Sequence, residues 1–218
     1  MTTAVLRDPS ANNDFWVKAG WVLLLVLALA AGLHALYFAI WGGDLFGGSR
    51  ERMFAIPAIG YMHTVGGGIA SIIGPFQFLG SIRRRYPRWH VWLGRIYLGC
   101  VGLSALGGLY LSPGSLASNT YGIAFIALAL AWLYTGTQAY LTIRRRDVQA
   151  HRRWMIRNYA LTYAAVTLRI QLPLLMLAGM DVVTGLNVTG WTCWVPSLIV
   201  VEWWMRRKGG ARYRIARA

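Results

Sequence analysis

Six apolar stretches, each roughly 20 residues long, follow one another along the chain and are separated by short polar segments. A helix of that length crosses the hydrocarbon core of a bilayer, which is about 30 Å thick. Backbone groups in lipid must be paired within a helix or a closed barrel, and continuous apolar runs without alternation favour helices. The pattern predicts an all-α, six-helix transmembrane bundle that forms a single domain over residues 1–218. The predicted spans cover residues 16–41, 54–82, 91–111, 121–143, 158–178 and 188–205.

Composition agrees with a membrane protein and excludes two other classes. Of the 218 residues, 56% are hydrophobic and 13% are charged, whereas a soluble domain carries about 25% charged residues. This excludes an ordinary soluble globule and a disordered chain. Cys100 and Cys193 lie inside apolar stretches and form no CxxC pair, so no disulfide framework or zinc site is predicted. The N-terminal segment does not resemble a cleaved signal, and we expect the first apolar stretch to be a retained helix.

The formal net charge of +15 would suggest a nucleic-acid partner in a soluble protein. Here the basic residues lie in blocks between the apolar stretches, as expected of the cytoplasmic loops of a membrane protein. With the N-terminus inside, all Lys and Arg residues lie in or next to the inner loops and the two termini, except Arg50, Arg52 and Arg169. The distribution predicts cytoplasmic N- and C-termini, contacts with anionic lipid headgroups and no nucleic-acid partner. The outer connections are short, so we expect any chemistry in the bundle or at its surfaces.

Two inner segments of the chain repeat one another. The recurring residues are a glutamine, three consecutive arginines, a histidine, an arginine and a tyrosine. They are Gln77, Arg83–Arg85, His90, Arg95 and Tyr97 in the first segment, and Gln138, Arg144–Arg146, His151, Arg157 and Tyr159 in the second. The hairpins of spans two and three and of spans four and five share one orientation, so the pattern predicts parallel repeats related by an axis along the membrane normal. The alternative is that arginine-rich loops resemble one another through composition alone.

The same region resembles a known family. The motifs that carry the resemblance are His63 with the GPFQF run Gly74–Phe78, the arginine-rich loop with Pro87 and His90, the GRIY run Gly94–Tyr97, the segment His151–Arg157, and ALTYAAVTLRIQLP at Ala160–Pro173. Together they resemble the predicted bacterial membrane proteins of domain of unknown function family 2306, over roughly Pro57 to Leu174. Where that family usually has arginine after the histidine, this chain has Val91. The resemblance implies a multi-pass protein of the bacterial inner (cytoplasmic) membrane and no established activity.

Two histidines are expected inside the membrane, where ionisable residues are costly and are candidates for function. His34 and His63 lie at similar depth, roughly 12–14 Å below the outer face at 1.5 Å per residue. Neutral imidazoles on facing helices can bind haem iron from both sides, so the pair predicts a site for haem b with these axial ligands. Gly67, one turn after His63, leaves room for a flat macrocycle. The alternatives are close helix packing at the glycines and two histidines that are hydrogen-bonded separately.

A second pair, His90 and His151, is expected at the inner face, at the starts of the third and fifth spans. With an arginine and a tyrosine beside each histidine, the pair predicts a site for a phosphate, a carboxylate or the propionates of a cofactor at helix N-termini. A variant of the haem hypothesis therefore places the cofactor here. The alternative is a set of interfacial residues that hold lipid headgroups. The neighbouring residues are Arg95, Tyr97, Arg157 and Tyr159.

The remaining polar residues of the spans add two expectations. Arg169 lies near the midplane with no acid expected at its depth, so it must use carbonyls, water or an anionic ligand. Pro173 can free carbonyls upstream of itself, which gives Arg169 a structural alternative. Gln77, Gln138 and Glu202 fall at similar depth toward the inner face, and we expect them to form one polar layer.

Hydrolytic chemistry has little support, because the sequence has no Gly-x-Ser-x-Gly turn, no HExxH motif, no P-loop and no pair of carboxylates within a span. The leading hypothesis is an inner-membrane protein that binds a b-type haem and transfers electrons to or from a membrane redox partner or a quinone. If it is an enzyme, it is then a membrane oxidoreductase. One alternative is a transporter or binding protein for a small molecule or lipid. Another is a non-catalytic accessory subunit of a membrane complex.

Overall fold

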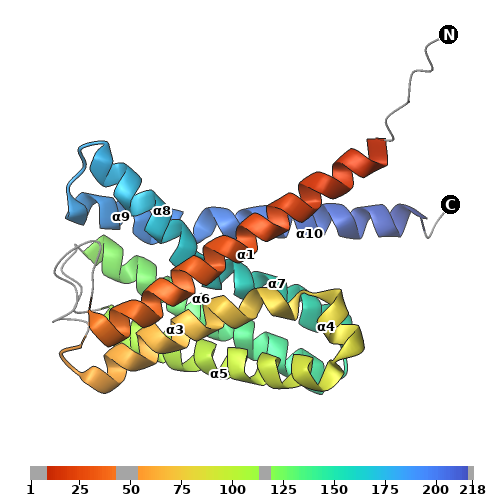
Figure 1. Cartoon of the computed structure of the whole chain (residues 1–218), viewed down its shortest axis with the longest axis horizontal. Coiled ribbons are helices and arrows are strands. Elements are labelled where there is room, and N and C mark those ends of the chain that lie inside the picture. Colours follow the sequence, from red (N-terminus) through yellow and green to blue (C-terminus); the bar gives the residue numbers. More distant parts are fainter. Residues whose placement is uncertain (1–8, 43–53, 113–118, 216–218) are drawn as a thin grey trace, which may run out of the picture.

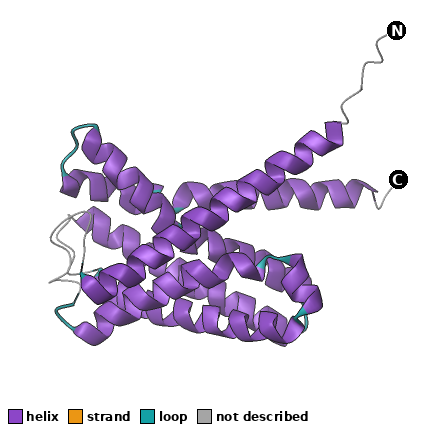
Figure 2. Ribbon diagram, in the orientation of Figure 1, coloured by secondary structure: helices purple, strands orange, loops and turns teal. Residues whose placement is uncertain are grey.

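The computed structural model describes residues 9–42, 54–112 and 119–215, and in these ranges every regular element is a helix (Figure 1, Figure 2). The predicted all-α fold is therefore confirmed for the described part of the chain. In chain order the helices are α1 (Pro9–Trp41), α3 (Pro57–Gln77), α4 (Gly80–Arg85), α5 (Pro87–Leu111), α6 (Asn119–Arg144), α7 (Val148–Thr162), α8 (Ala164–Leu177), α9 (Val182–Thr192) and α10 (Val195–Ile215).

Four helical stretches of the described chain are long and apolar enough to cross a membrane. They are α1, α5, α6 and the consecutive pair α7–α8. Helix α3 has 21 residues, which makes it about 31 Å long at a rise of 1.5 Å per residue. Helix α3 and the consecutive pair α9–α10 occupy the positions of the second and sixth predicted spans. All six predicted spans are thus present in the bundle.

The last two spans are divided, which the apolar pattern did not predict. The fifth span is split at Tyr163 into α7 and α8, and the sixth is split after Thr192 into α9 and α10. The second split has a clear cause, since Pro196 has no N–H to donate to the Thr192 carbonyl. Gln171 Nε2 on α8 donates to that carbonyl instead, at 3.3 Å. The two divided spans therefore contact each other at the split of the sixth.

Helix α9 begins where the chain turns back on the side of the molecule away from α4 (Figure 1). Gly179, with φ of +89°, follows α8 in the left-handed conformation that favours glycine. Asp181 is the N-cap of α9, and its Oδ1 accepts hydrogen bonds from the amides of Val183 and Thr184, each at 3.0 Å. Hydrogen bonds from Thr184 hold the pKa of the Asp181 carboxyl below its usual value. This turn is therefore specified by local sequence.

The predicted hairpins are present. Helix α3 packs against α5, α6 packs against α7, and α5 packs against α6 to join the two hairpins. Helix α1 lies on α3, α9 contacts α6 and α8, and α10 lies on α7. In Figure 1 the N-terminal part of α1 and the C-terminal part of α10 extend away from the bundle on the side where α4 lies. Both ends of the described chain thus lie on one side, as the predicted topology requires.

Small residues let α1 and α3 approach closely. A Cβ added at Gly32 would lie 2.6 Å from Ile72 Cγ1 and 2.8 Å from the Gly68 carbonyl oxygen. Ser71 Oγ donates a hydrogen bond to the Ala28 carbonyl at 3.1 Å, next to this contact. Small residues that bring helix backbones together are a common basis of helix association in membranes. The glycines of α3 therefore serve helix packing on this side.

Candidate functional site

The outer polar residues form one connected group, although the sequence predicted no contact between Arg169 and a histidine. Arg169 Nε on α8 donates to His34 Nδ1 on α1 at 3.3 Å, and Arg169 Nη1 donates to the Ala165 carbonyl at 2.9 Å. Arg169 also interacts electrostatically with His63 on α3. Counting from the outer end of the fifth span would have placed Arg169 at the depth of the two histidines, and this signal was missed.

His63 is held between α3 and α5. Its Nδ1 lies 2.9 Å from the Ser104 carbonyl, and Ser104 Oγ donates to the His63 carbonyl at 2.7 Å. A Cβ added at Gly108 would lie 3.1 Å from His63 Nδ1, and one added at Gly67 would lie 3.0 Å from Ser104 Oγ. The face of α3 at Gly67 is therefore filled by α5. Of the two interpretations of this glycine, close helix packing is the one that agrees with the structure.

The inner histidines come from matching positions of the two hairpins. His90 lies at the start of α5 and His151 at the start of α7, and the two interact electrostatically. His151 Nδ1 lies 2.8 Å from the Ala139 carbonyl on α6. His90 Nδ1 is buried and has no hydrogen-bond partner among the described residues. The two histidines of the predicted pair thus begin matching helices, and His90 Nδ1 remains able to form a further hydrogen bond.

Two further buried polar groups lie on helices α3 and α7. Gln77 is 6% exposed, and its Nε2 has no hydrogen-bond partner in the part of the chain that the structure describes. It lies against α5, because a Cβ added at Gly94, one turn after His90, would be 3.3 Å from Gln77 Oε1. The Tyr159 hydroxyl on α7 is also buried and has no hydrogen-bond partner among the described residues. Unpaired buried polar groups are costly, so His90, Gln77 and Tyr159 retain unsatisfied capacity to bind a ligand or water.

Tyr97, which the sequence placed beside the inner histidines, has its hydroxyl in a buried polar network. Its ring is fully buried, and its hydroxyl donates to Asn158 Oδ1 and contacts Thr162 Oγ1, both at 2.7 Å. Asn158 Nδ2 donates to the Trp132 carbonyl and to Thr135 Oγ1, both at 2.9 Å. Trp132 Nε1 completes the group by donating to Thr162 Oγ1 at 2.9 Å. This buried polar network joins α5, α6 and α7, and sequence reasoning missed four of its five members.

The two hairpins place arginine on tryptophan in the same way. The Arg95 guanidinium lies 5.3 Å from the ring centroid of Trp92 on α5, and that of Arg157 lies 4.7 Å from the ring centroid of Trp154 on α7. Both contacts are cation–π interactions. With the matching hairpins and histidines, these contacts agree with the predicted repeat.

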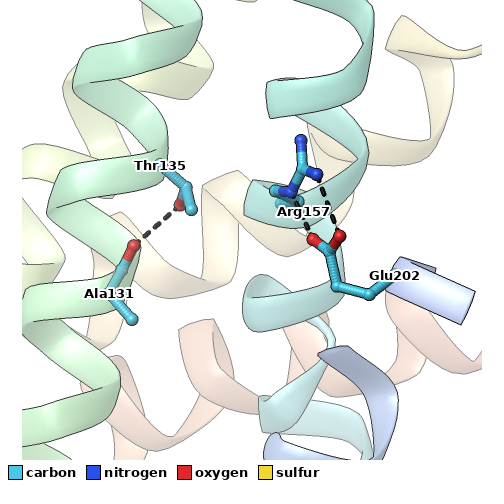
Figure 3. Close-up of polar contacts among 4 residues, drawn as sticks. All are labelled: Ala131, Thr135, Arg157 and Glu202. Carbon is cyan, nitrogen blue, oxygen red and sulfur yellow. Dashed lines mark hydrogen bonds and ion pairs between the residues drawn. The ribbon is translucent and has the colours of Figure 1, made fainter. Parts of the chain in front are cut away.

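Arg157 also forms an ion pair that the sequence did not predict. Its Nε and Nη2 donate to Glu202 Oε1 and Oε2 on α10, the second bond at 3.0 Å (Figure 3). Glu202 therefore neutralises Arg157. Among the described residues, no hydrogen bond links the Gln138 side chain to Gln77 or Glu202. The polar layer of these three residues stays a prediction.

Replacing Glu202 with glutamine should lower the free energy of unfolding by roughly 1–2 kcal/mol. The side chains of Arg157 and Glu202 are 20% and 31% exposed, so the effect should lie between the small one of a surface pair and the large one of a buried pair. Thermal unfolding of the purified protein in detergent measures the change. Arg153→Gln, at an exposed position of α7, is the control and should leave stability unchanged. Equal stability of E202Q and the unsubstituted protein would contradict the structural importance of the pair.

Comparison with known proteins agrees with the fold. The model of the family described as predicted membrane protein (DUF2306) matches residues 60–205, more than half of the chain. The match extends past the segment that carried the resemblance and includes Glu202 on α10. Searches among curated proteins and among solved structures gave no match. This apolar bundle of helices is a membrane protein, and the chain belongs to the DUF2306 family.

Proposed function

We propose that the protein binds a b-type haem at the cytoplasmic end of the two hairpins, where His90 and His151 would hold it, and that the bound haem would supply electron transfer in the bacterial inner membrane. The observation that carries the proposal is that His90 and His151 begin the matching helices α5 and α7, and that His90 Nδ1 is buried with no hydrogen-bond partner among the described residues. Bundle cores build cofactor sites from side chains on different helices that face one another. The proposal assumes that both termini lie in the cytoplasm, as the arginine distribution predicts.

The ring contacts of His151 suit a haem ligand. A hydrogen bond from Nδ1 to a backbone carbonyl places the ring proton on Nδ1 and leaves the Nε2 lone pair for a metal, and such a second contact commonly orients metal-binding histidines. His151 has this contact with the Ala139 carbonyl. His90 Nδ1 has no partner among the described residues, so its ring is not committed to another protein group on that side.

The outer pair suits a haem less well, because of His34. Its Nδ1 accepts a hydrogen bond from Arg169, so a neutral ring carries its proton on Nε2 and has no further lone pair for iron. The face of α3 beside His63 at Gly67 is also filled by Ser104. The ring nitrogens of His90 and His151 therefore fit a haem iron, whereas those of the outer pair, His34 and His63, do not.

Residues of the chain would orient a histidine ring and supply positive charge at the proposed haem site. A bound haem would supply one-electron chemistry through its iron. The Ala139 carbonyl orients the His151 ring, and Arg83, whose charge acts on His90, would pair with propionate carboxylates. An electron donor or acceptor would reach the site from the membrane, which fits a membrane redox protein or a quinone as partner.

A reduced-minus-oxidised optical spectrum of the purified full chain, made with ample haem supply, tests the proposal. We expect low-spin b-type bands and about one haem per chain in a pyridine haemochrome assay. His151→Ala and His90→Ala should each abolish the bands, whereas His63→Ala should retain them. His151→Met should restore haem with a higher midpoint potential, because methionine ligation raises it. A colourless but folded protein would overturn the proposal, as would loss of haem in His63→Ala alone.

A second candidate function, transport of a small molecule or lipid, is favoured by the two divided spans. Thr167 Oγ1 on α8 donates to the Cys193 carbonyl beside the split of the sixth span, and Thr192 Oγ1 donates to Gln171 Oε1 at 2.9 Å. Divided helices that meet inside the bundle are a feature of transporter sites. This alternative predicts a colourless protein. Thr167→Val and Gln171→Leu should then alter substrate uptake into proteoliposomes without altering topology.

A further inference from the structure

The two hairpins match, but only one of them is covered by another helix. Arg157 and Trp154 on α7 correspond to Arg95 and Trp92 on α5 in the repeat. Helix α10 lies on α7 and brings Glu202 to Arg157. On α5, Arg95 is exposed and has no carboxylate within ion-pair distance among the described residues. The first hairpin therefore lacks the helix and the acid that complete the second.

The difference extends along the helix face that holds each arginine. One and two turns after Arg157, Leu161 and Ala164 are only 2% and 4% exposed. They belong to a core cluster with residues from the α9–α10 region, namely Cys193, Trp194, Val195 and Leu198. That region is the part of the chain that follows the repeated hairpins. The face that continues from Arg157, through Leu161 near the end of α7 to Ala164 at the start of α8, is thus buried, and α10 lies against α7.

The matching face of α5 is open. One and two turns after Arg95 lie Gly99 and Gly102, and a Cβ added at either position would meet no atom within 4 Å. Leu106 lies one turn further and is 53% exposed. We call these four residues, Arg95, Gly99, Gly102 and Leu106, the α5 face. The open face thus has an arginine at one end and two glycines in its middle.

We infer that the α5 face binds a transmembrane helix of a different membrane protein, and that this helix carries a carboxylate at the level of Arg95. The partner helix would occupy the place that α10 occupies on α7, with its Asp or Glu acting as Glu202 does. Lipid chains alone do not account for the glycines, because each glycine in a helix costs about 1 kcal/mol relative to alanine. Close approach of another helix does account for them.

A second copy of this chain is a poorer occupant than a different protein. A symmetric contact of two α5 faces would bring Arg95 against Arg95, and like charges repel. Glu202 of a second copy is already bound to Arg157 of its own chain. A carboxylate side chain for Arg95 would therefore come from a helix outside this protein. The inference stands whether or not a haem is bound.

Site-specific photocrosslinking in native membranes tests the inference. A benzophenone amino acid placed at Gly99 of the full chain should crosslink one membrane protein, through a transmembrane segment with Asp or Glu near its cytoplasmic end. The same probe at Leu130, a 52% exposed residue of α6, is the control and should not capture that protein. Crosslinks to lipid only, to a second copy of this chain, or to a helix without an acid would each overturn the proposal.

Exchanging the charges of Arg95 and the partner's acid tests whether an ion pair holds the two helices together or whether they are merely close to each other. Arg95→Glu should abolish the crosslink at Gly99, whereas Arg88→Glu, an exposed arginine nearer the start of α5, should not. Exchanging the partner's acid for arginine should restore the crosslink to the Arg95→Glu variant. Because Arg95 is exposed, neither change should unfold the bundle, and unchanged circular dichroism is the check. A crosslink that persists in Arg95→Glu would overturn the proposed ion pair.

Discussion

Replacing Gly74 with alanine should prevent the protein from reaching its folded, monodisperse state in detergent. A Cβ at this position of α3 would lie 2.5 Å from Tyr159 Cδ2 and closer still to Cε2. The Tyr159 ring is 6% exposed and packs against the rings of Phe78 and Tyr163, so it has little room to move. Overpacking of this kind costs about 1–3 kcal/mol or more, a large part of the stability of a small protein.

Size-exclusion profile and thermal unfolding measure this effect. Gly99→Ala is the matched control, because a Cβ there meets no atom within 4 Å, and it should leave folding unchanged. Tyr159→Ala should partly rescue Gly74→Ala by removing the ring, whereas Tyr159→Phe should not, since the ring remains. A Gly74→Ala protein with wild-type stability would show that α3 and α7 are not packed as described.

Replacing Asn158 with leucine should destabilise the bundle by roughly 2–4 kcal/mol, because a buried polar network would lose its central member. Asn158 is 0% exposed and accepts from Tyr97 while donating to Trp132 and Thr135. The leucine would leave the Trp132 carbonyl and the two hydroxyls without this partner. In membrane proteins such bonds contribute about 0.6 kcal/mol each on average, so the larger part of the effect should come from the unpaired groups.

Unfolding in mixed detergent, followed by circular dichroism, measures this change. Tyr97→Phe should cost less than Asn158→Leu, and the double variant should cost less than the sum of both, because the two residues share a hydrogen bond. Thr137→Val, an exposed position on α6, is the control. Additive effects of the two substitutions would contradict a single network.

Several features could be predicted from sequence because they are local. Apolar runs of membrane-spanning length predicted the helices, and the recurring Gln, Arg, His and Tyr residues predicted the two hairpins. The inner pair His90 and His151 followed from the same repeat, since equal positions in parallel hairpins lie at equal depth. The family resemblance rested on contiguous motifs and was confirmed by the match over residues 60–205.

The sequence by itself thus determined the helical class, the number of spans and the repeat. Hydropathy and residue spacing are properties of the linear sequence and do not depend on which helices contact each other. Only the tertiary structure decided which polar side chains meet. Arg169 bonds to His34, Arg157 pairs with Glu202, and Tyr97 bonds to Asn158. Depth along the chain cannot predict such partners, since each depends on how neighbouring helices are rotated and how closely they approach. The open face of α5 is likewise visible only once α10 is seen to cover its counterpart on α7.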